Sequence, residues 1–256
     1  MAEIVIQKEF MKTSDVRILI VDDEPLLLEM ISDLFETYEF QVDKASSGNQ
    51  GWELCQKNSY NLVLTDVRMA DGDGIELTKK IKAHHATVPS VLIMSGFTDL
   101  LNEEIYHFGA EGKFTKPFDN KAIRNAVQTC LLTPVARWDK PLTGDRRTLN
   151  IKKTGESFSE LESQKKVLFG RGGFFIAHAL SPPDKGSIVT FTIEVQKPKL
   201  VTLKGEGIVR WIQHHGKHNI PAGIGIEIIS LPQPESKIYQ EYFGKLVPYI
   251  PSPGKL

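Results

Sequence analysis

The chain has 256 residues, of which 41% are hydrophobic, and its charges nearly balance, with 31 Lys and Arg against 32 Asp and Glu. This length exceeds that of a usual single domain and predicts two domains. Two cysteines exclude a disulfide framework, no apolar run approaches the roughly 18 residues of a membrane span, and residues 1–15 lack the pattern of a signal peptide, so we expect a soluble, cytoplasmic protein.

The two halves of the chain differ in charge. Residues 1–133 contain 13 Lys and Arg against 21 Asp and Glu, whereas residues 134–256 contain 18 against 11. An acidic half suits a cation site, and a basic half suits a phosphate-bearing ligand, an acidic partner or the other half of the chain. Two solvated surfaces that simply differ would give the same counts, so charge leaves these alternatives open.

After an N-terminal extension at residues 1–15, residues 16–133 alternate short apolar runs with helical periods. The runs are short enough to be strands and apolar enough to be buried on both faces. Such alternation predicts an α/β doubly wound domain with a five-stranded parallel sheet and right-handed crossovers. The expected strands are 18–21, 40–45, 62–65, 91–94 and 113–115, and the expected helices are 25–35, 48–57, 75–83, 100–108 and 121–132.

Polar residues follow four of these expected strands: the pair Asp22 and Asp23, then Asp66, Ser95 and Lys116. Ligands of open α/β sheets collect outside the carboxyl ends of the strands, so one sheet edge could bring all of them together. Carboxylates beside a Lys and a hydroxyl suit magnesium-dependent phosphoryl transfer. Either acidic fragment alone would be typical of a turn.

A calcium loop is a second interpretation of the acidic residues, because Asp71 and Asp73 flank glycines. The later bidentate Glu that an EF-hand requires is missing, so we set this interpretation aside.

The stretches 18–24, 66–74, 95–96 and 116–118 together resemble response-regulator receiver domains, in order and in spacing, over residues 16–133. That family has a flavodoxin-like fold. One departure is Ala70, where the family usually has Pro; it shapes a loop and we expect little consequence.

The resemblance implies a role for each matched residue. Asp66 would accept a phosphoryl group from a histidine kinase or a phosphotransfer protein, Ser95 and Lys116 would stabilise it, and Ser95 and Phe114 would form the switch. Phe114 could equally belong to the core. The Mg²⁺ ligands would be Asp22, Asp23, Asp66 and the backbone carbonyl of Arg68. Such a domain phosphorylates only itself, so we expect no enzyme acting on an external substrate, and a homodimer through the receiver's last helices is a further implication.

Residues 134–145 contain two prolines and no sustained period, which predicts a linker. Beyond it, β-branched and aromatic runs are separated by Gly, Pro and Asp-Lys turns, which predicts a small all-β barrel followed by a C-terminal helix. The expected strands include 167–169, 174–177, 187–193, 201–211 and 223–229, and the expected helix is 234–249.

The second domain, 146–256, resembles PilZ domains through the stretches 172–176, 205–211 and 221–227. PilZ domains are six-stranded barrels, and many bind cyclic di-GMP through an Arg-x-x-x-Arg stretch and an Asp/Asn-x-Ser-x-x-Gly turn. Here Arg146 and Arg147 supply only the first Arg, and Gly173 is the only match in the turn, where Leu168 stands at the Asp/Asn position. Arg171 could compensate.

Two outputs therefore remain open. The PilZ-like domain is a protein-interaction module for a downstream protein that the sequence does not name, or it is a cyclic di-GMP sensor that combines phosphorylation with the second messenger. The missing base-reading side chains favour the first. The basic half contains candidate phosphate contacts but nothing that resembles a recognition helix, so we do not expect nucleic-acid binding. These candidates are Lys152, Lys153, Lys165 and Lys166.

Overall fold

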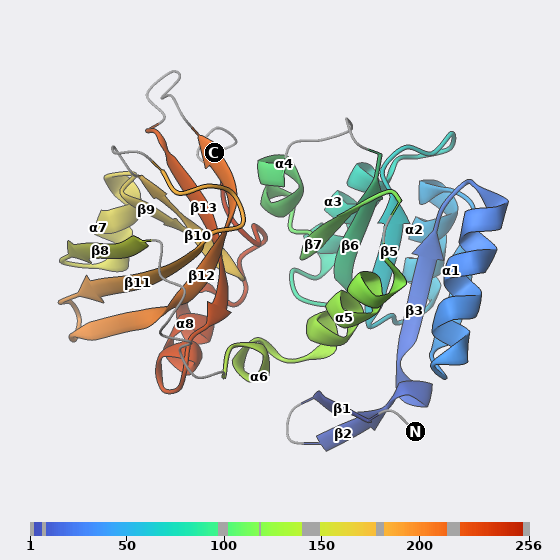
Figure 1. The fold of residues 1–256 in the computed structure, drawn as a ribbon, viewed down its shortest axis with the longest axis horizontal. Helices are drawn as coiled ribbons and strands as arrows, with labels where there is room; N and C mark the ends of the chain where they lie inside the picture. The colour runs from blue at the N-terminus through green and yellow to red at the C-terminus, as the bar shows by residue number, and fades with distance from the viewer. Residues whose placement is uncertain are drawn as a thin grey trace. The chain divides into compact units, whose positions relative to one another are not determined.

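The computed structural model describes residues 3–6, 9–96, 102–117, 119–139, 149–177, 182–213 and 221–252. The chain divides into two compact units (Figure 1). The first consists of Met1–Leu101 and Phe108–Ala136, and the second of Asn102–His107 and Arg137–Leu256.

The first unit is built on a five-stranded parallel sheet in the order β4-β3-β5-β6-β7. The central strands β3, β5 and β6 are buried on both faces, as their Val, Ile and Leu content requires in a sheet covered by helices. The prediction of a doubly wound five-stranded parallel sheet is therefore confirmed. The strands are β3 (Arg17–Val21), β4 (Gln41–Ala45), β5 (Leu62–Asp66), β6 (Ser90–Ser95) and β7 (Gly112–Thr115).

Helices α1 (Pro25–Thr37) and α5 (Asn120–Leu131) pack on one face of this sheet, where their apolar residues join those of the strands in one core. Helices α2 (Gly48–Lys57) and α3 (Gly74–His84) lie against each other on the other face (Figure 1). Local chemistry fixes where they begin: the Ser47 side chain accepts the N–H of Gln50, and that of Asp73 accepts two N–H groups of α3.

The N-terminal extension contains two strands that the sequence did not suggest. Strands β1 (Glu3–Ile6) and β2 (Glu9–Lys12) form an antiparallel pair, and a 3-10 turn at Thr13–Asp15 leads into β3. Neither four-residue strand alternates polar and apolar residues, so the sequence carries no two-residue period that would distinguish it from a loop.

The second unit is built on a six-stranded sheet in the order β8-β11-β12-β13-β10-β9. All pairs are antiparallel except β8 with β11. Alternate residues of β11 are buried, as expected for a strand with one face on a core. Within the described residues no ladder joins β8 to β9, so the sheet is a half-closed barrel. Its strands are β8 (Leu149–Gly155), β9 (Val167–Phe169), β10 (Gly173–Ala177), β11 (Ile188–Val195), β12 (Val201–Gln213) and β13 (Gly223–Ser230).

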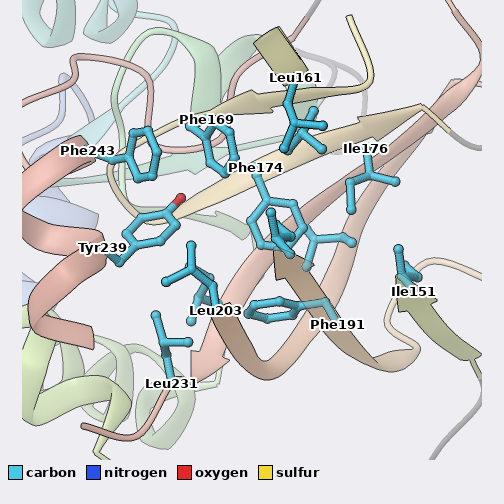
Figure 2. Close-up of a cluster of buried hydrophobic side chains, with 14 of the residues drawn as sticks. Ile151, Leu161, Phe169, Phe174, Ile176, Phe191, Leu203, Leu231, Tyr239 and Phe243 are labelled. Atoms are coloured by element: carbon cyan, nitrogen blue, oxygen red, sulfur yellow. The ribbon is translucent and has the colours of Figure 1, made fainter. Parts of the chain in front are cut away.

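Two helices, α7 (Phe158–Ser163) and α8 (Glu235–Phe243), cover the concave side of this sheet. Figure 2 shows Tyr239 and Phe243 of α8 pointing into the same core as Phe169 and Phe174. The expected helix 234–249 is thus too long, because it ends at Phe243 and the chain continues in an irregular segment.

The predicted linker also differs from the structure. Residues Pro134–Trp138 form a short helix, α6, and Trp138 is fully buried in the core of the second unit, edge-on to Tyr239 at 5.5 Å. The Trp138 side chain therefore anchors the end of α6 in the second unit, whose longer segment begins at Arg137. Residues 140–148 lie outside the described part of the chain.

By its contacts, α4 (Asn102–His107) belongs to the second unit, although its residues lie within the span expected for the receiver. Tyr106 stacks on Tyr249 with their ring centres 6.2 Å apart, and its carbonyl accepts the N–H of Tyr249 at 2.9 Å.

Candidate functional site

The carboxyl edge of the parallel sheet brings three of the expected residues into direct contact. Asp22 follows β3, Asp66 ends β5 and Lys116 follows β7. The Lys116 ammonium lies 2.6 Å from Asp66 Oδ1 and 2.9 Å from Asp22 Oδ2. The contact arises because the carboxyl ends of parallel strands lie at the same edge of the sheet, so residues that follow different strands come close together there.

Burial sets the electrostatics of the cluster. Asp22 is fully buried, and burial raises its pKa above the ordinary value of 3.8, although the Glu24 N–H and Lys116 both act in the opposite direction. Burial alone would lower the pKa of Lys116, but its hydrogen bonds to Asp66 and Asp22 outweigh burial and raise that pKa. The ammonium therefore stays charged and neutralises carboxylates that would otherwise repel each other.

Asp66 is held with both oxygens engaged. Oδ1 contacts Lys116, and Oδ2 accepts the backbone N–H of Arg68 at 2.8 Å. The residue is 7% exposed, so the carboxylate keeps a narrow opening to solvent. The exposed Asp23 accepts the N–H of Ala70 at 3.2 Å, which ties the loop after β5 to the loop after β3.

The donor set fits Mg²⁺ only as a partial coordination shell. Among the described residues, no group of three or more His, Cys, Asp or Glu side chains is arranged to hold a metal by itself. Mg²⁺ prefers hard oxygens, usually keeps several waters and completes its octahedron with phosphate oxygens. The carboxylates of Asp22, Asp23 and Asp66 offer that chemistry, and the Arg68 carbonyl stays a predicted ligand.

Ser95, the last residue of β6, is fully buried, and its Oγ has no hydrogen-bond partner among the described residues. Buried hydroxyls are normally paired, so an orphan at this edge of the sheet is a free donor or acceptor for an incoming group. Phe114 of β7 is half-buried and packs against the core that α1 and α5 share with the sheet.

The acidic residues of the calcium interpretation have structural partners. Asp71 accepts a hydrogen bond from the Asn49 amide at 2.8 Å, and Asp73 caps α3. Sequence reasoning missed the importance of Gly74 in this loop. A Cβ there would lie 1.9 Å from the backbone oxygen of Asp66, so only glycine lets α3 begin this close to the acceptor.

Of the residues considered for nucleotide binding, the structure describes Arg171 and Gly173. Arg146 and Arg147 lie outside the described residues. Arg171 is 4% exposed, and its guanidinium donates to the carbonyls of Leu246 and Val247 at 3.0 and 2.8 Å. In this conformation the Arg171 guanidinium is bonded to the chain's own carbonyls, and a compensating role in ligand binding stays a prediction.

The glycine turn before β10 is covered by the C-terminal segment 246–252. Arg171 and Gly172 donate their N–H groups to Pro248 and Tyr249 carbonyls at 2.7 and 2.9 Å. A Cβ on Gly172 would lie 2.0 Å from the Tyr249 ring, and one on Gly173 would lie 2.0 Å from the Ile226 carbonyl. The turn is thus a tight packing element.

Two candidate phosphate-binding lysines also have partners: Lys152 pairs with Glu194 at 3.3 Å, and Lys153 donates to the Ala177 carbonyl at 2.8 Å. Lys165 and Lys166 lie exposed on the turn before β9. No helix in the described residues is long and apolar enough to cross a membrane.

The first unit is similar to known proteins. The family model described as the response regulator receiver domain matches residues 18–128. The transcriptional regulatory protein SrrA of Staphylococcus aureus is 29% identical over 114 residues, which are 44% of this chain and 47% of SrrA. The chain thus spans about half the length of the curated relatives it matches.

Solved structures of similar proteins match the same portion. A receiver domain protein from Clostridium thermocellum is 28% identical with a TM-score of 0.43, covering 45% of this chain and 94% of that one. The response regulator protein TrrA from Thermotoga maritima, in complex with Mg²⁺ and BeF, is 22% identical with a TM-score of 0.41, covering 45% and 98%.

Proposed function

Because residues 18–128 form a response regulator receiver domain, we propose that this chain is a cytoplasmic signalling protein switched by phosphorylation of Asp66. The observation that supports this best is the bridge from Lys116 to both Asp66 and Asp22 at 2.6 and 2.9 Å. It places a fixed positive charge beside the one carboxylate that ends the central strand of the sheet. The donor is a histidine kinase or a phosphotransfer protein.

The transfer follows from the way Asp66 is held. One oxygen attacks phosphorus as the bond from phosphorus to the donor nitrogen breaks, so the phosphoryl group moves without a free intermediate. Lys116 neutralises charge that gathers on the phosphoryl oxygens, and the Arg68 N–H keeps the carboxylate oriented. Asp22, Asp23, Asp66 and the Arg68 carbonyl would hold Mg²⁺, which would supply further positive charge to the phosphoryl oxygens.

The orphan hydroxyl of Ser95 gives the switch its first step. A phosphoryl group on Asp66 supplies the acceptor that Ser95 Oγ lacks, so Ser95 turns toward it. Phe114, one strand away and half-buried, then follows into the space that Ser95 leaves. The switch is thus a change in packing between two discrete arrangements.

We further propose that the second unit is a PilZ-like domain that works mainly as a protein-interaction module. Arg171 is bonded to the chain's own carbonyls and the glycine turn is covered by Tyr249, so neither presents a ligand surface. The alternative, a cyclic di-GMP sensor, depends on Arg146 and Arg147. Heat on calorimetric titration of cyclic di-GMP would favour that alternative, and its absence favours the interaction module.

The phosphorylation site is tested with acetyl phosphate and Mg²⁺ on the full chain. Wild type is expected to gain one hydroxylamine-labile phosphate, seen by intact mass, and Asp66→Ala to gain none. Asp33→Ala removes an exposed carboxylate from α1 and serves as the matched control, which should label like wild type. Labelling of Asp66→Ala at the wild-type level would refute the assignment.

A further inference from the structure

A groove on the second unit lies between α7, α8 and the loop after β11. Its volume is about 320 Å³, near the lower end for ligand pockets, which usually exceed roughly 300 Å³. Its walls include Phe158, Tyr242, Phe243 and Leu246, and Glu162 and Lys197 supply its charges. This space suits one or two side chains.

The aromatic walls meet at steep angles. The rings of Phe158 and Tyr242 lie 4.9 Å apart at 63°, and those of Phe158 and Phe243 lie 5.1 Å apart at 79°. Phe158 and Phe243 are buried, whereas Tyr242 is 44% exposed. Rings at such angles present both a face and an edge to the groove, and the exposed Tyr242 leaves apolar surface uncovered.

Glu162 is the unusual group in this setting. It is half-buried, and within the described part of the chain its carboxylate accepts a single hydrogen bond, from the Phe169 N–H at a long 3.3 Å. No Lys or Arg among the described residues pairs with it. Burial raises the pKa of Glu162, only partly offset by that N–H. Lys197 forms an ion pair with Glu156 at 3.0 Å. Among the charged residues that line the groove, Glu162 therefore remains without a pairing cation.

We propose that this groove binds an arginine side chain of a partner protein, presented on a peptide segment with apolar neighbours. Arginine fits both features. Its planar guanidinium stacks on the faces of aromatic rings and donates two parallel hydrogen bonds to one carboxylate. The negative charge of Glu162 disfavours phosphate-bearing ligands. This inference rests on the proposed interaction function and names the chemistry of the partner.

The test is an NMR titration of the ¹⁵N-labelled full chain with a capped Ala-Leu-Arg-Leu-Ala peptide. A peptide in which citrulline replaces arginine has the same shape without the charge. The arginine peptide should shift the amide signals of α7 and α8, and the citrulline peptide should bind at least about tenfold more weakly, because a charge-assisted hydrogen bond is lost.

Two variants locate the site. Glu162→Gln keeps an acceptor for the Phe169 N–H and should weaken the arginine peptide about tenfold or more. Glu160→Gln removes the same charge from the same helix, but Glu160 bonds the Glu156 N–H and the Gln164 amide and does not line the groove, so binding should be unchanged.

Three results would overturn the proposal: no shifts at millimolar peptide, equal binding of the two peptides, or equal losses from the two variants. The titration needs no phosphorylation, so its failure leaves the Asp66 assignment intact. Failure of Asp66 labelling would instead remove the proposed function and leave the peptide result standing.

Discussion

Replacing Lys116 by methionine tests the electrostatic argument for the receiver site most directly. The variant keeps the aliphatic stem and removes the ammonium that lies 2.6 Å from Asp66 and 2.9 Å from Asp22. A charge pair at about 4 Å is worth about 4 kcal/mol at an effective dielectric constant of about 20. Removing Lys116 also ends the cost of burying its charge, so we expect unfolding free energy to fall by about 2 kcal/mol at neutral pH.

The pH dependence of this loss gives the sharper signature. The pKa of Asp22 is raised in the folded protein, so the folded chain binds a proton more readily than the unfolded chain. The contribution of Asp22 to the free energy of unfolding therefore increases as pH falls through its folded pKa, which lies above the ordinary value of 3.8. Without Lys116 that pKa rises further, and the deficit of Lys116→Met should shrink as the solution is acidified.

Urea unfolding of both proteins at about pH 7.5 and about pH 5, with a chelator to remove divalent metal, measures this difference. Lys121→Met, at an exposed position of α5, controls for the loss of one positive charge and should change stability by less than about 0.5 kcal/mol. A variant as stable as wild type at neutral pH, or a deficit that does not shrink on acidification, would refute the reasoning.

Two further substitutions test the packing around the acceptor. Gly74→Ala should destabilise the first unit by about 3 kcal/mol in urea unfolding, because the added Cβ would lie 1.9 Å from the Asp66 carbonyl oxygen and α3 must move; a loss below about 1 kcal/mol would contradict this. Ser95→Ala should leave the free energy of unfolding unchanged or raise it by about 1 kcal/mol, because the buried Ser95 hydroxyl has no partner among the described residues. In the same variant, the ring signals of Phe114 should stop responding to beryllofluoride. A response as large as in wild type would separate Phe114 from Ser95.

The sequence predicted the first unit well because its signals are local. Each buried strand is a short apolar run, and each helix has its own period. The order of the elements, and the sheet edge that carries Asp22, Asp66 and Lys116, therefore follow from topology rules. The contact among these three residues is found in the structure, whereas their catalytic and metal-binding roles remain predictions.

The second unit shows where such reasoning ends. The sequence predicted a C-terminal helix but not which of its side chains are buried: Tyr239 and Phe243 point into the core, whereas Tyr242 is 44% exposed. A wide apolar stripe on a short helix leaves its rotation uncertain by one position. The hydrogen bonds of Arg171 to Leu246 and Val247 join residues 75 and 76 positions apart, and no local pattern encodes such a contact.

The cover on the glycine turn has a thermodynamic consequence. Segment 246–252 is tethered to the surface it occupies, so it acts as an intramolecular competitor whose effective concentration is on the order of millimolar or higher. Any molecule that approaches the turn must displace Tyr249, whose hydroxyl is also held by Arg137 at 2.8 Å. The measured affinity of that molecule for the turn is then lower, because it can bind only during the fraction of time in which the segment is displaced. A ligand of the turn would thus bind the intact chain more weakly than a chain whose covering segment is detached.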